Sequence, residues 1–502
     1  MNNPKSPLPT PYSLLPTPRK VRRWVGLLVM TILLVVVSRL PASADTAQHY
    51  TDLKFAPLPE IQIPKYTRYK LDNGMVVYLM EDHELPLIGG TALVRTGDRF
   101  EPADKVGLGA LTGEVMRTGG TTLHSGDELN QLLEQRAASV ETGIGTSSGS
   151  ASFSALSTDL DTVFDLFTEV IQKPAFAQEK LEFAKRQQAG QIARRNDDPN
   201  DITGREFQKL LYGDSSPYGR TVEYATLNNI SRQDLVAFYE KYFHPENMIL
   251  GIIGDFDSNK MRSLIQAKFG KWSSASKAPQ STLPSVSQAK QGGVFFVNQP
   301  QLTQSYVQMG HLGGQLNSPD YPALDVLNQV MNGFGGRLFN EVRSRQGLAY
   351  SVYSFWSPNY DYPGTFVAGG QTRSDATVPF VKAIRAEIEQ LRTKPITATE
   401  LDFAKDQVLN SFVFKFQDPV QTLSRLMRYE YYGYPADFLF RYQQGVKATT
   451  IEDVQRVAQK YLQPDQLVTL VVGNASAIQP PLTSLSADVT SLDITIPKPN
   501  NS

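Results

Sequence analysis

Two residues in the C-terminal half of the sequence, Arg343 and Tyr350, could together bind a carbonyl group or an oxyanion. Three glycines within residues 333–336 predict a turn, because glycine adopts positive φ at little cost. Residues 337–345 then show the apolar spacing of a short helix, and after a Gln-Gly pair residues 348–355 alternate like a strand. Arg343 would end the helix and Tyr350 would begin the strand, so the cation and the phenol could converge on one point. The same local pattern also fits a surface arginine and a sheet tyrosine that have no function.

The side chains that most often bind zinc are scarce in this chain. It has no cysteine and five histidines, and no two of the histidines lie within one turn of a predicted helix. The histidines are His49, His83, His124, His244 and His311. The composition therefore predicts no zinc site, and the absence of cysteine excludes disulfides and thiolate chemistry.

The length and composition are those of an ordinary globular protein with more than one domain. The 502 residues are 41% hydrophobic and 20% charged, and the formal net charge is −1. Nucleic-acid binding needs a clustered basic excess, which the sequence lacks outside its N-terminus. We therefore expect no nucleic-acid partner.

The N-terminus has the pattern of a signal peptide. Basic residues at positions 19–23 precede the apolar run of residues 24–37, which is short for a membrane span of about 20 residues. Ala42-Ser43-Ala44 is typical of a cleavage site, so residues 1–44 are predicted to be removed and residues 45–60 to form a tether. We expect export to the periplasm or an equivalent compartment. Arg39 is unusual in a cleavage region, so an uncleaved membrane anchor is the alternative.

The rest of the chain repeats one unit. Lys241-Tyr-Phe-His-Pro245 is echoed by Lys460-Tyr-Leu-Gln-Pro464, and Gly254 by Gly473; 460 − 241 and 473 − 254 both equal 219. Residues 273–291, rich in Ser, Ala, Gln and Pro, are predicted to be the linker. The sequence thus predicts a tandem duplication of an α+β unit. Its parts are an N-terminal domain over residues 61–272, a C-terminal domain over residues 292–478 and a flexible tail over residues 479–502.

Three sequence blocks carry a resemblance to a known family: Leu71-Asp-Asn-Gly74, Gly107-Leu108…Gly119, and the stretch from Gly335 to Tyr350. Over about residues 60–475 the chain resembles the pitrilysin, insulin-degrading and mitochondrial processing peptidase family. The resemblance implies two similar α/β-roll domains, each a mixed sheet with helices packed on one face. It also implies that two such chains close like a clamshell around an unfolded peptide. Active members carry an inverted zinc motif, His-x-x-Glu-His, on the first helix of the N-terminal half.

This sequence departs from the family pattern at each metal position. The first His of the motif falls on Ala110, the Glu on Gly113 and the second His on Glu114. The distal glutamate falls on Gly190 or Gln191, in a long charged helix predicted over about residues 177–195. We therefore expect this chain to bind no zinc and no other cofactor.

Arg343 and Tyr350, in contrast, match the Arg/Tyr pair of active family members, which holds the substrate backbone across the chamber from the zinc. The resemblance implies that they are the catalytic residues of this chain. We expect an exported, zinc-less subunit of a heterodimeric metallopeptidase, inactive alone, whose homologous partner carries the zinc motif and which acts on unfolded peptides. The alternatives are a homodimer that binds peptides as a chaperone without cutting them, and a structural scaffold subunit.

Overall fold

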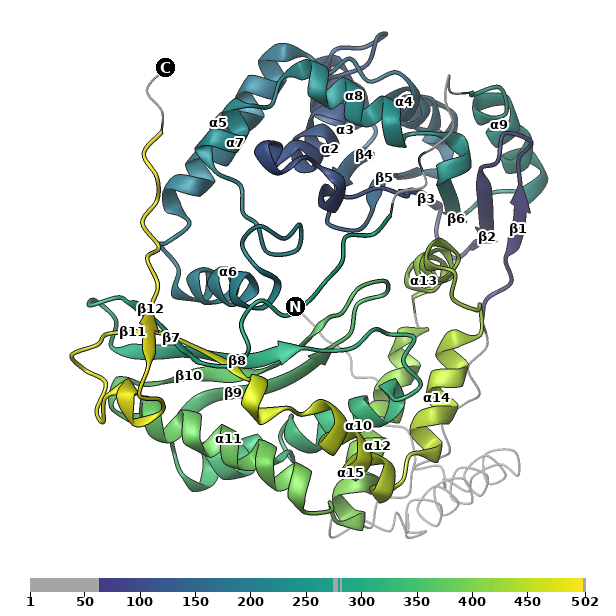
Figure 1. The fold of residues 1–502 in the computed structure, drawn as a ribbon. Coiled ribbons are helices and arrows are strands. Elements are labelled where there is room, and N and C mark those ends of the chain that lie inside the picture. The colour runs from purple at the N-terminus through teal and green to yellow at the C-terminus, as the bar shows by residue number, and fades with distance from the viewer. Residues whose placement is uncertain (1–62, 274–278, 280–281, 417, 500–502) are drawn as a thin grey trace, which may run out of the picture. The chain divides into compact units, whose positions relative to one another are not determined.

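Two six-stranded mixed sheets, one in each half of the sequence, form the framework of the computed structural model (Figure 1). The structure describes residues 63–273, 279, 282–416 and 418–499. The strand orders are β1-β2-β6-β3-β5-β4 and β12-β7-β11-β8-β10-β9. The predicted α+β fold with two mixed sheets is confirmed.

The strands of the N-terminal sheet are β1 Thr67–Lys70, β2 Val76–Glu81, β3 Leu87–Val94, β4 Ser139–Ile144, β5 Gly149–Leu156 and β6 Met248–Gly254. Those of the C-terminal sheet are β7 Val294–Asn298, β8 Gln304–Leu312, β9 Ala349–Ser357, β10 Thr365–Arg373, β11 Val468–Gly473 and β12 Val489–Ser491. The helices of the N-terminal half are α2 Leu108–Thr118, α3 Gly126–Glu134, α4 Leu160–Gln172, α5 Gln178–Arg194, α6 Pro199–Tyr212, α7 Tyr224–Asn228, α8 Arg232–Tyr242 and α9 Ser258–Phe269. Those of the C-terminal half are α10 Tyr321–Met331, α11 Thr377–Thr393, α12 Ala398–Phe412, α13 Pro419–Tyr432, α14 Phe438–Ala448 and α15 Ile451–Tyr461.

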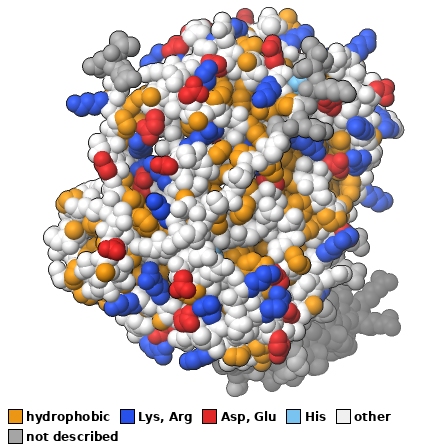
Figure 2. Space-filling view, in the orientation of Figure 1, with side chains coloured by type: hydrophobic (Ala, Val, Ile, Leu, Met, Phe, Trp, Pro, Cys, Tyr) orange, Lys and Arg blue, Asp and Glu red, His pale blue; other side chains and the backbone are white. Residues whose placement is uncertain are grey.

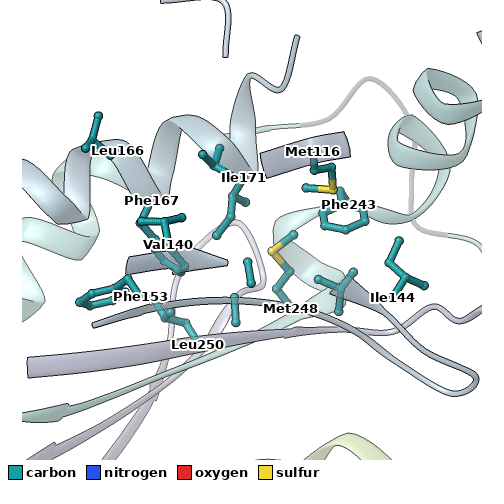
Figure 3. Packing of buried hydrophobic residues seen from close by; sticks show 14 of the residues in the cluster. Met116, Val140, Ile144, Phe153, Leu166, Phe167, Ile171, Phe243, Met248 and Leu250 are labelled. Carbon is teal, nitrogen blue, oxygen red and sulfur yellow. The ribbon is translucent and has the colours of Figure 1, made fainter. Parts of the chain in front are cut away.

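Each sheet packs its own helices on one face, as predicted. In the N-terminal half, Figure 3 shows Phe153 of β5 meeting Phe167 of α4, and Met116 of α2 lying near Met248 of β6. The ring centroids of Phe153 and Phe167 are 4.9 Å apart. Alternate residues of each strand point to this face, so it is continuous and apolar, and its burial stabilises the half as one core.

The opposite face of each sheet is covered in part by a helix from the other half. α13 of the C-terminal half packs on the N-terminal sheet, and α6 of the N-terminal half packs on the C-terminal sheet. The two helices occupy equivalent places in the repeat: each starts after a capping aspartate, Asp198 or Asp418, and 418 − 198 = 220. The halves therefore complete each other's cores, which sequence reasoning did not foresee.

The two ends of the chain differ in what the structure shows. The predicted signal peptide (1–44) and tether (45–60) lie outside the described residues. Across the described ranges, none of the helices is long and apolar enough to cross a membrane. The predicted flexible tail is corrected in part, because residues 489–491 form strand β12, which pairs parallel with β7. The tail is also fixed by a hydrogen bond of 2.7 Å from the Asn196 side chain to the backbone oxygen of Ile494.

Positive and negative side chains are interspersed on the face drawn in Figure 2, with hydrophobic atoms between them. This distribution is that of an ordinary globular surface. The absence of a nucleic-acid partner stays a prediction.

Candidate active site

The helix that carries Arg343 is a π-helix over Leu338–Arg345, rather than the α-helix that the spacing suggests. Its amide–carbonyl bonds span five residues, for example from the Gln346 amide to the Glu341 oxygen at 3.1 Å. Leu338 and Val342 bury its apolar face, as the sequence predicted. π-Helical turns are rare and occur often at functional sites.

A β-bulge sets the direction of Tyr350 at the start of β9. Ser351 pairs with Gln371 of β10, but Ala349 pairs with the next residue, Thr372, so Tyr350 is an extra residue without a partner in the ladder. Bulges redirect side chains and occur often beside active sites. The Tyr350 side chain is accordingly 84% exposed, although it belongs to a strand.

The structure brings the two predicted residues together. The Arg343 guanidinium carbon lies 4.9 Å from the ring centroid of Tyr350, and it lies equally 4.9 Å from the ring centroid of Phe339. An arginine between two aromatic rings is held by cation–π attraction on both sides. This contact fixes the direction of the guanidinium without using its hydrogen-bond donors.

Those donors are available to a ligand. Among the described residues, no side chain or backbone group hydrogen-bonds to the Arg343 guanidinium or to the Tyr350 hydroxyl. A cavity of about 350 Å³ adjoins Tyr350, between the ends of β8 and β10 and the residues that precede β9. A carbonyl oxygen placed beside both Arg343 and Tyr350 could accept hydrogen bonds from a cation and a phenol at once.

Two aromatic residues at this site were missed by sequence reasoning. Phe339 lies four residues before Arg343, a spacing that places two side chains on one helix face and that could have revealed the stack. Phe334, in the glycine turn, is 85% exposed and packs on Phe339 with 5.1 Å between ring centroids. Together they extend the site into an exposed aromatic surface beside Arg343.

The strand next to this surface has a free edge. β9 is the last strand of the C-terminal sheet and pairs only with β10 among the described strands. An extended peptide can add to such an edge through backbone hydrogen bonds. The arrangement can thus hold a peptide backbone beside Arg343 and Tyr350.

The zinc positions of the resembled family lie on α2 and α5, which pack against each other in the structure. Ala110 on α2 is exposed and has no ligand atom, as expected from the sequence. Glu114 is half-buried, and burial raises the pKa of its carboxyl above the ordinary value. Gly190 and Gln191 of α5 are both exposed. Among the described residues, no three His, Cys, Asp or Glu side chains are grouped so that they could hold a metal ion.

The remaining motif position, Gly113, is packed against a strand. A β-carbon at Gly113 would lie 2.5 Å from the backbone nitrogen of Ile144 in β4, closer than real contacts allow. The Thr142 hydroxyl of the same strand donates to the Gly113 oxygen. The strand therefore occupies the space that the motif glutamate would need, and the residues at these motif positions do not fit a zinc ion.

Comparison with known proteins identifies the family. Residues 91–215 match the model described as insulinase (peptidase family M16), and residues 229–408 match the one described as the peptidase M16 inactive domain. This chain belongs to the insulinase family of peptidases, and the resemblance inferred from its motifs is confirmed.

Relatives and solved structures agree with that assignment. An uncharacterised zinc protease of Rickettsia felis is 25% identical over 354 residues, which cover 68% of this chain and 82% of that protein. The uncharacterised zinc protease YmxG of Bacillus subtilis is 23% identical over 362 residues, 71% of this chain and 86% of that one.

Two solved structures share the fold. A peptidase M16 inactive domain from Pseudomonas fluorescens superposes with a TM-score of 0.73 at 24% identity, covering 83% of this chain and all (100%) of that one. The periplasmic protease PqqL of Escherichia coli superposes with a TM-score of 0.70 at 18% identity, covering 84% of this chain but only 47% of that one. This chain thus corresponds to about half of the Escherichia coli protein.

Proposed function

We propose that this chain is the zinc-less subunit of an exported heterodimeric peptidase that cleaves unfolded peptides. A homologous partner supplies the zinc motif, and this chain supplies Arg343 and Tyr350. One contrast carries the proposal. The pair converges, with its donors available, in the C-terminal half, whereas Ala110, Gly113 and Glu114 provide no zinc site in the N-terminal half.

In this proposal the chain's own residues bind and orient the substrate. An extended peptide pairs with the free edge of β9, and Arg343 and Tyr350 donate hydrogen bonds to a peptide oxygen where negative charge develops during attack by water. The ring of Phe339 keeps the guanidinium in place. Zinc in the partner would activate the attacking water, and the two chains would close as a clamshell around the substrate.

Export is a part of the proposal that can be tested separately. It is supported by the sequence pattern of residues 1–44 and by the likeness to a protein described as a periplasmic protease. N-terminal sequencing of the exported protein should find Asp45 as the first residue. A chain that keeps Met1 in the membrane fraction would instead indicate an uncleaved anchor.

The function itself is tested by reconstitution. The purified chain should contain no stoichiometric zinc by elemental analysis and should cleave no peptide by itself. Mixed with a homologous chain that carries His-x-x-Glu-His, it should form a complex that cleaves unfolded peptides faster than the homologous chain alone.

Three results would overturn the proposal. One tightly bound zinc per chain, with peptide cleavage by the chain alone, would contradict the division of roles. A homodimer that binds peptides, and that adds nothing to the activity of any zinc-bearing homologue, would favour a chaperone. A chain that binds neither peptide nor zinc-bearing homologue would favour a structural scaffold.

A further inference from the structure

A second cavity, of about 420 Å³, lies on the N-terminal sheet, away from Arg343 and Tyr350. It is bounded by strands β3, β5 and β6 and by the first turns of α13. Because α13 belongs to the C-terminal half, both halves of the chain form the cavity wall. Its volume is within the range of ordinary ligand pockets, about 300–1,000 Å³.

The repeat allows the sheet at this cavity to be compared with the equivalent part of the C-terminal sheet. In the N-terminal sheet, Gly89 of β3 pairs with Ile253 of β6 and Ser154 of β5. In the C-terminal sheet, Tyr306 of β8 pairs with Val472 of β11 and Gln371 of β10. Ile253 and Val472 are equivalent, since 472 − 253 = 219, the offset of the repeat. Gly89 and Ser154 therefore stand where the C-terminal half has a tyrosine and a glutamine.

The same replacement affects the helix that crosses each sheet. In the C-terminal half the Gln371 side chain donates a hydrogen bond of 3.2 Å to Asn200, at the start of α6, and so ties the helix to the sheet. The residue equivalent to Asn200 is Val420 at the start of α13, since 420 − 200 = 220. Val420 and Ser154 cannot make this bond. In the N-terminal half this part of the sheet therefore carries smaller side chains, at Gly89 and Ser154, and lacks this hydrogen bond to the helix that crosses it.

The lining of the cavity is apolar with an acidic rim. Leu85, Leu87 and Val420 are large hydrophobic residues that remain exposed around it, and exposed apolar surface of this kind marks interaction sites. The carboxylates of Asp82, Glu84 and Asp418 also line it, and no lining residue is Lys, Arg or His. One oxygen of Asp418 caps α13 by accepting from the Val420 amide at 2.8 Å. The rim therefore complements a positive charge.

We propose that this cavity binds an apolar side chain of an unfolded peptide, next to a basic residue or a free amino terminus of the same peptide. The leucines and Met427 would contact the apolar side chain, and the carboxylates would face the cation. The inference goes beyond the proposed function, because it needs neither Arg343 and Tyr350 nor a zinc-bearing partner. It gives the chain a second contact with a peptide.

Binding of short labelled peptides to the purified full chain tests the proposal. Three unstructured, fluorescein-labelled peptides are compared by anisotropy: a Leu-Leu core flanked by lysines, the same core flanked by glutamates, and an Ala-Ala core flanked by lysines. The first should bind at least about tenfold more tightly than the other two, because burial of a leucine side chain and a complementary charge both contribute. Added salt should weaken its binding, since the rim is exposed.

Three variants locate the binding. Ser154→Gln combined with Val420→Asn restores the bond seen in the other half and should weaken binding of the lysine-flanked peptide about tenfold or more. Glu84→Lys, at an exposed position, should reduce the preference for lysine over glutamate flanks. Leu123→Gln, an exposed leucine outside the cavity, is the matched control and should leave binding unchanged.

The thermal unfolding midpoint of each variant checks that it is folded. If Ser154→Gln with Val420→Asn fails to fold, Glu84→Lys decides alone, because its exposed side chain supports no core contact. Equal binding of all three peptides would overturn the proposal. So would wild-type binding by both cavity variants. Because the assay contains no partner and measures no cleavage, this failure differs from failure of the proposed heterodimeric activity.

Discussion

The two halves of this chain share a fold but differ in what their surfaces can do. Both halves have the same central strand order, and both have a capping box at the start of an equivalent helix. Each half also has one helix that packs on the sheet of the other half. In the N-terminal half the helix that carries zinc ligands in active family members packs through Gly113 onto β4 and bears no ligand set. In the C-terminal half a bulge exposes Tyr350 to solvent, and a π-helix places the half-buried Arg343 beside it. The two halves thus share the framework of the fold, although the residues at these surfaces differ in their chemistry.

The halves also depend on each other physically. Besides the exchanged helices α6 and α13, two ion pairs between described residues join the halves: Arg99 with Asp361, and Arg68 with Glu430. These pairs differ in burial, since the Arg99 side chain is 4% exposed and that of Arg68 is 43% exposed. The comparison predicts that one of them is essential to stability and the other is not.

The largest expected effect follows from the buried pair. Arg99 donates hydrogen bonds of 3.0 and 2.8 Å to both oxygens of Asp361. Arg99→Ala would leave the Asp361 carboxylate without a counter-charge between the two halves. It should reduce the free energy of unfolding by about 3–5 kcal/mol. Denaturation in urea measures the loss. Arg68→Ala is the control and should reduce the free energy of unfolding by less than about 1 kcal/mol. Equal losses for the two variants would contradict the view that the buried pair stabilises the contact between the halves more than the exposed pair does.

Glu101 and Asp320 precede the first long helix of each half, and their contributions to stability should depend on pH in opposite ways. Burial raises the pKa of Glu101 to about 7, although the amides of Gly107 and Gly109 donate to it. The pKa of Asp320 falls to about 2, because hydrogen bonds from Lys460 and Arg456 outweigh the opposing effect of burial.

The signs of the two contributions are opposite. The stability that Glu101 contributes is fully present below its ordinary pKa of 4.5 and is lost as the pH rises through about 7. The contribution of Asp320 is present above 3.8 and is lost as the pH falls through about 2. Between pH 4.5 and 7 the wild type should therefore lose up to about 3 kcal/mol relative to Glu101→Gln. Urea denaturation over this range measures it, and parallel curves for the two proteins would contradict the assignment.

The smallest effect should be the same in both halves. Ser231 and Thr450 cap α8 and α15 in equivalent capping boxes, and 450 − 231 = 219. Replacing either residue by alanine removes a cap and should cost about 1 kcal/mol in unfolding free energy. The double variant should lose the sum, because the two caps are independent. A loss of unfolding free energy for only one of the two alanine variants would show that the two capping boxes do not contribute equally to stability.

The sequence predicted well what depends on local pattern. The Asp72-Asn73-Gly74 turn joins β1 to β2 as expected, with φ of 95° at Gly74, and the strand after Gly347 begins at Ala349. It did not predict features that depend on distant contacts. The exchange of α6 and α13 satisfies the apolar second face of each sheet, and periodicity along one strand cannot say which helix covers that face.

The candidate site shows the same limit. The types and spacing of Arg343 and Tyr350 identified the pair, but the bulge that exposes Tyr350 arises from register with β10, which the local sequence does not encode. Likewise, the missing zinc ligands could be seen in the sequence, whereas the closure of Gly113 against β4 required the structure.

The most direct test of the account measures peptide turnover by the reconstituted pair when this chain carries Tyr350→Phe or Arg343→Ala. Tyr350→Phe removes one exposed hydroxyl and keeps the ring against Arg343. Arg343→Ala also removes a cation from a helix end, a loss of only about 0.3–1 kcal/mol in stability. If the pair stabilises developing negative charge, kcat should fall about 10²–10³-fold while complex formation is unchanged. Variants that assemble and cleave at the wild-type rate would show that Arg343 and Tyr350 are inherited scaffold, and would contradict the proposed division of roles.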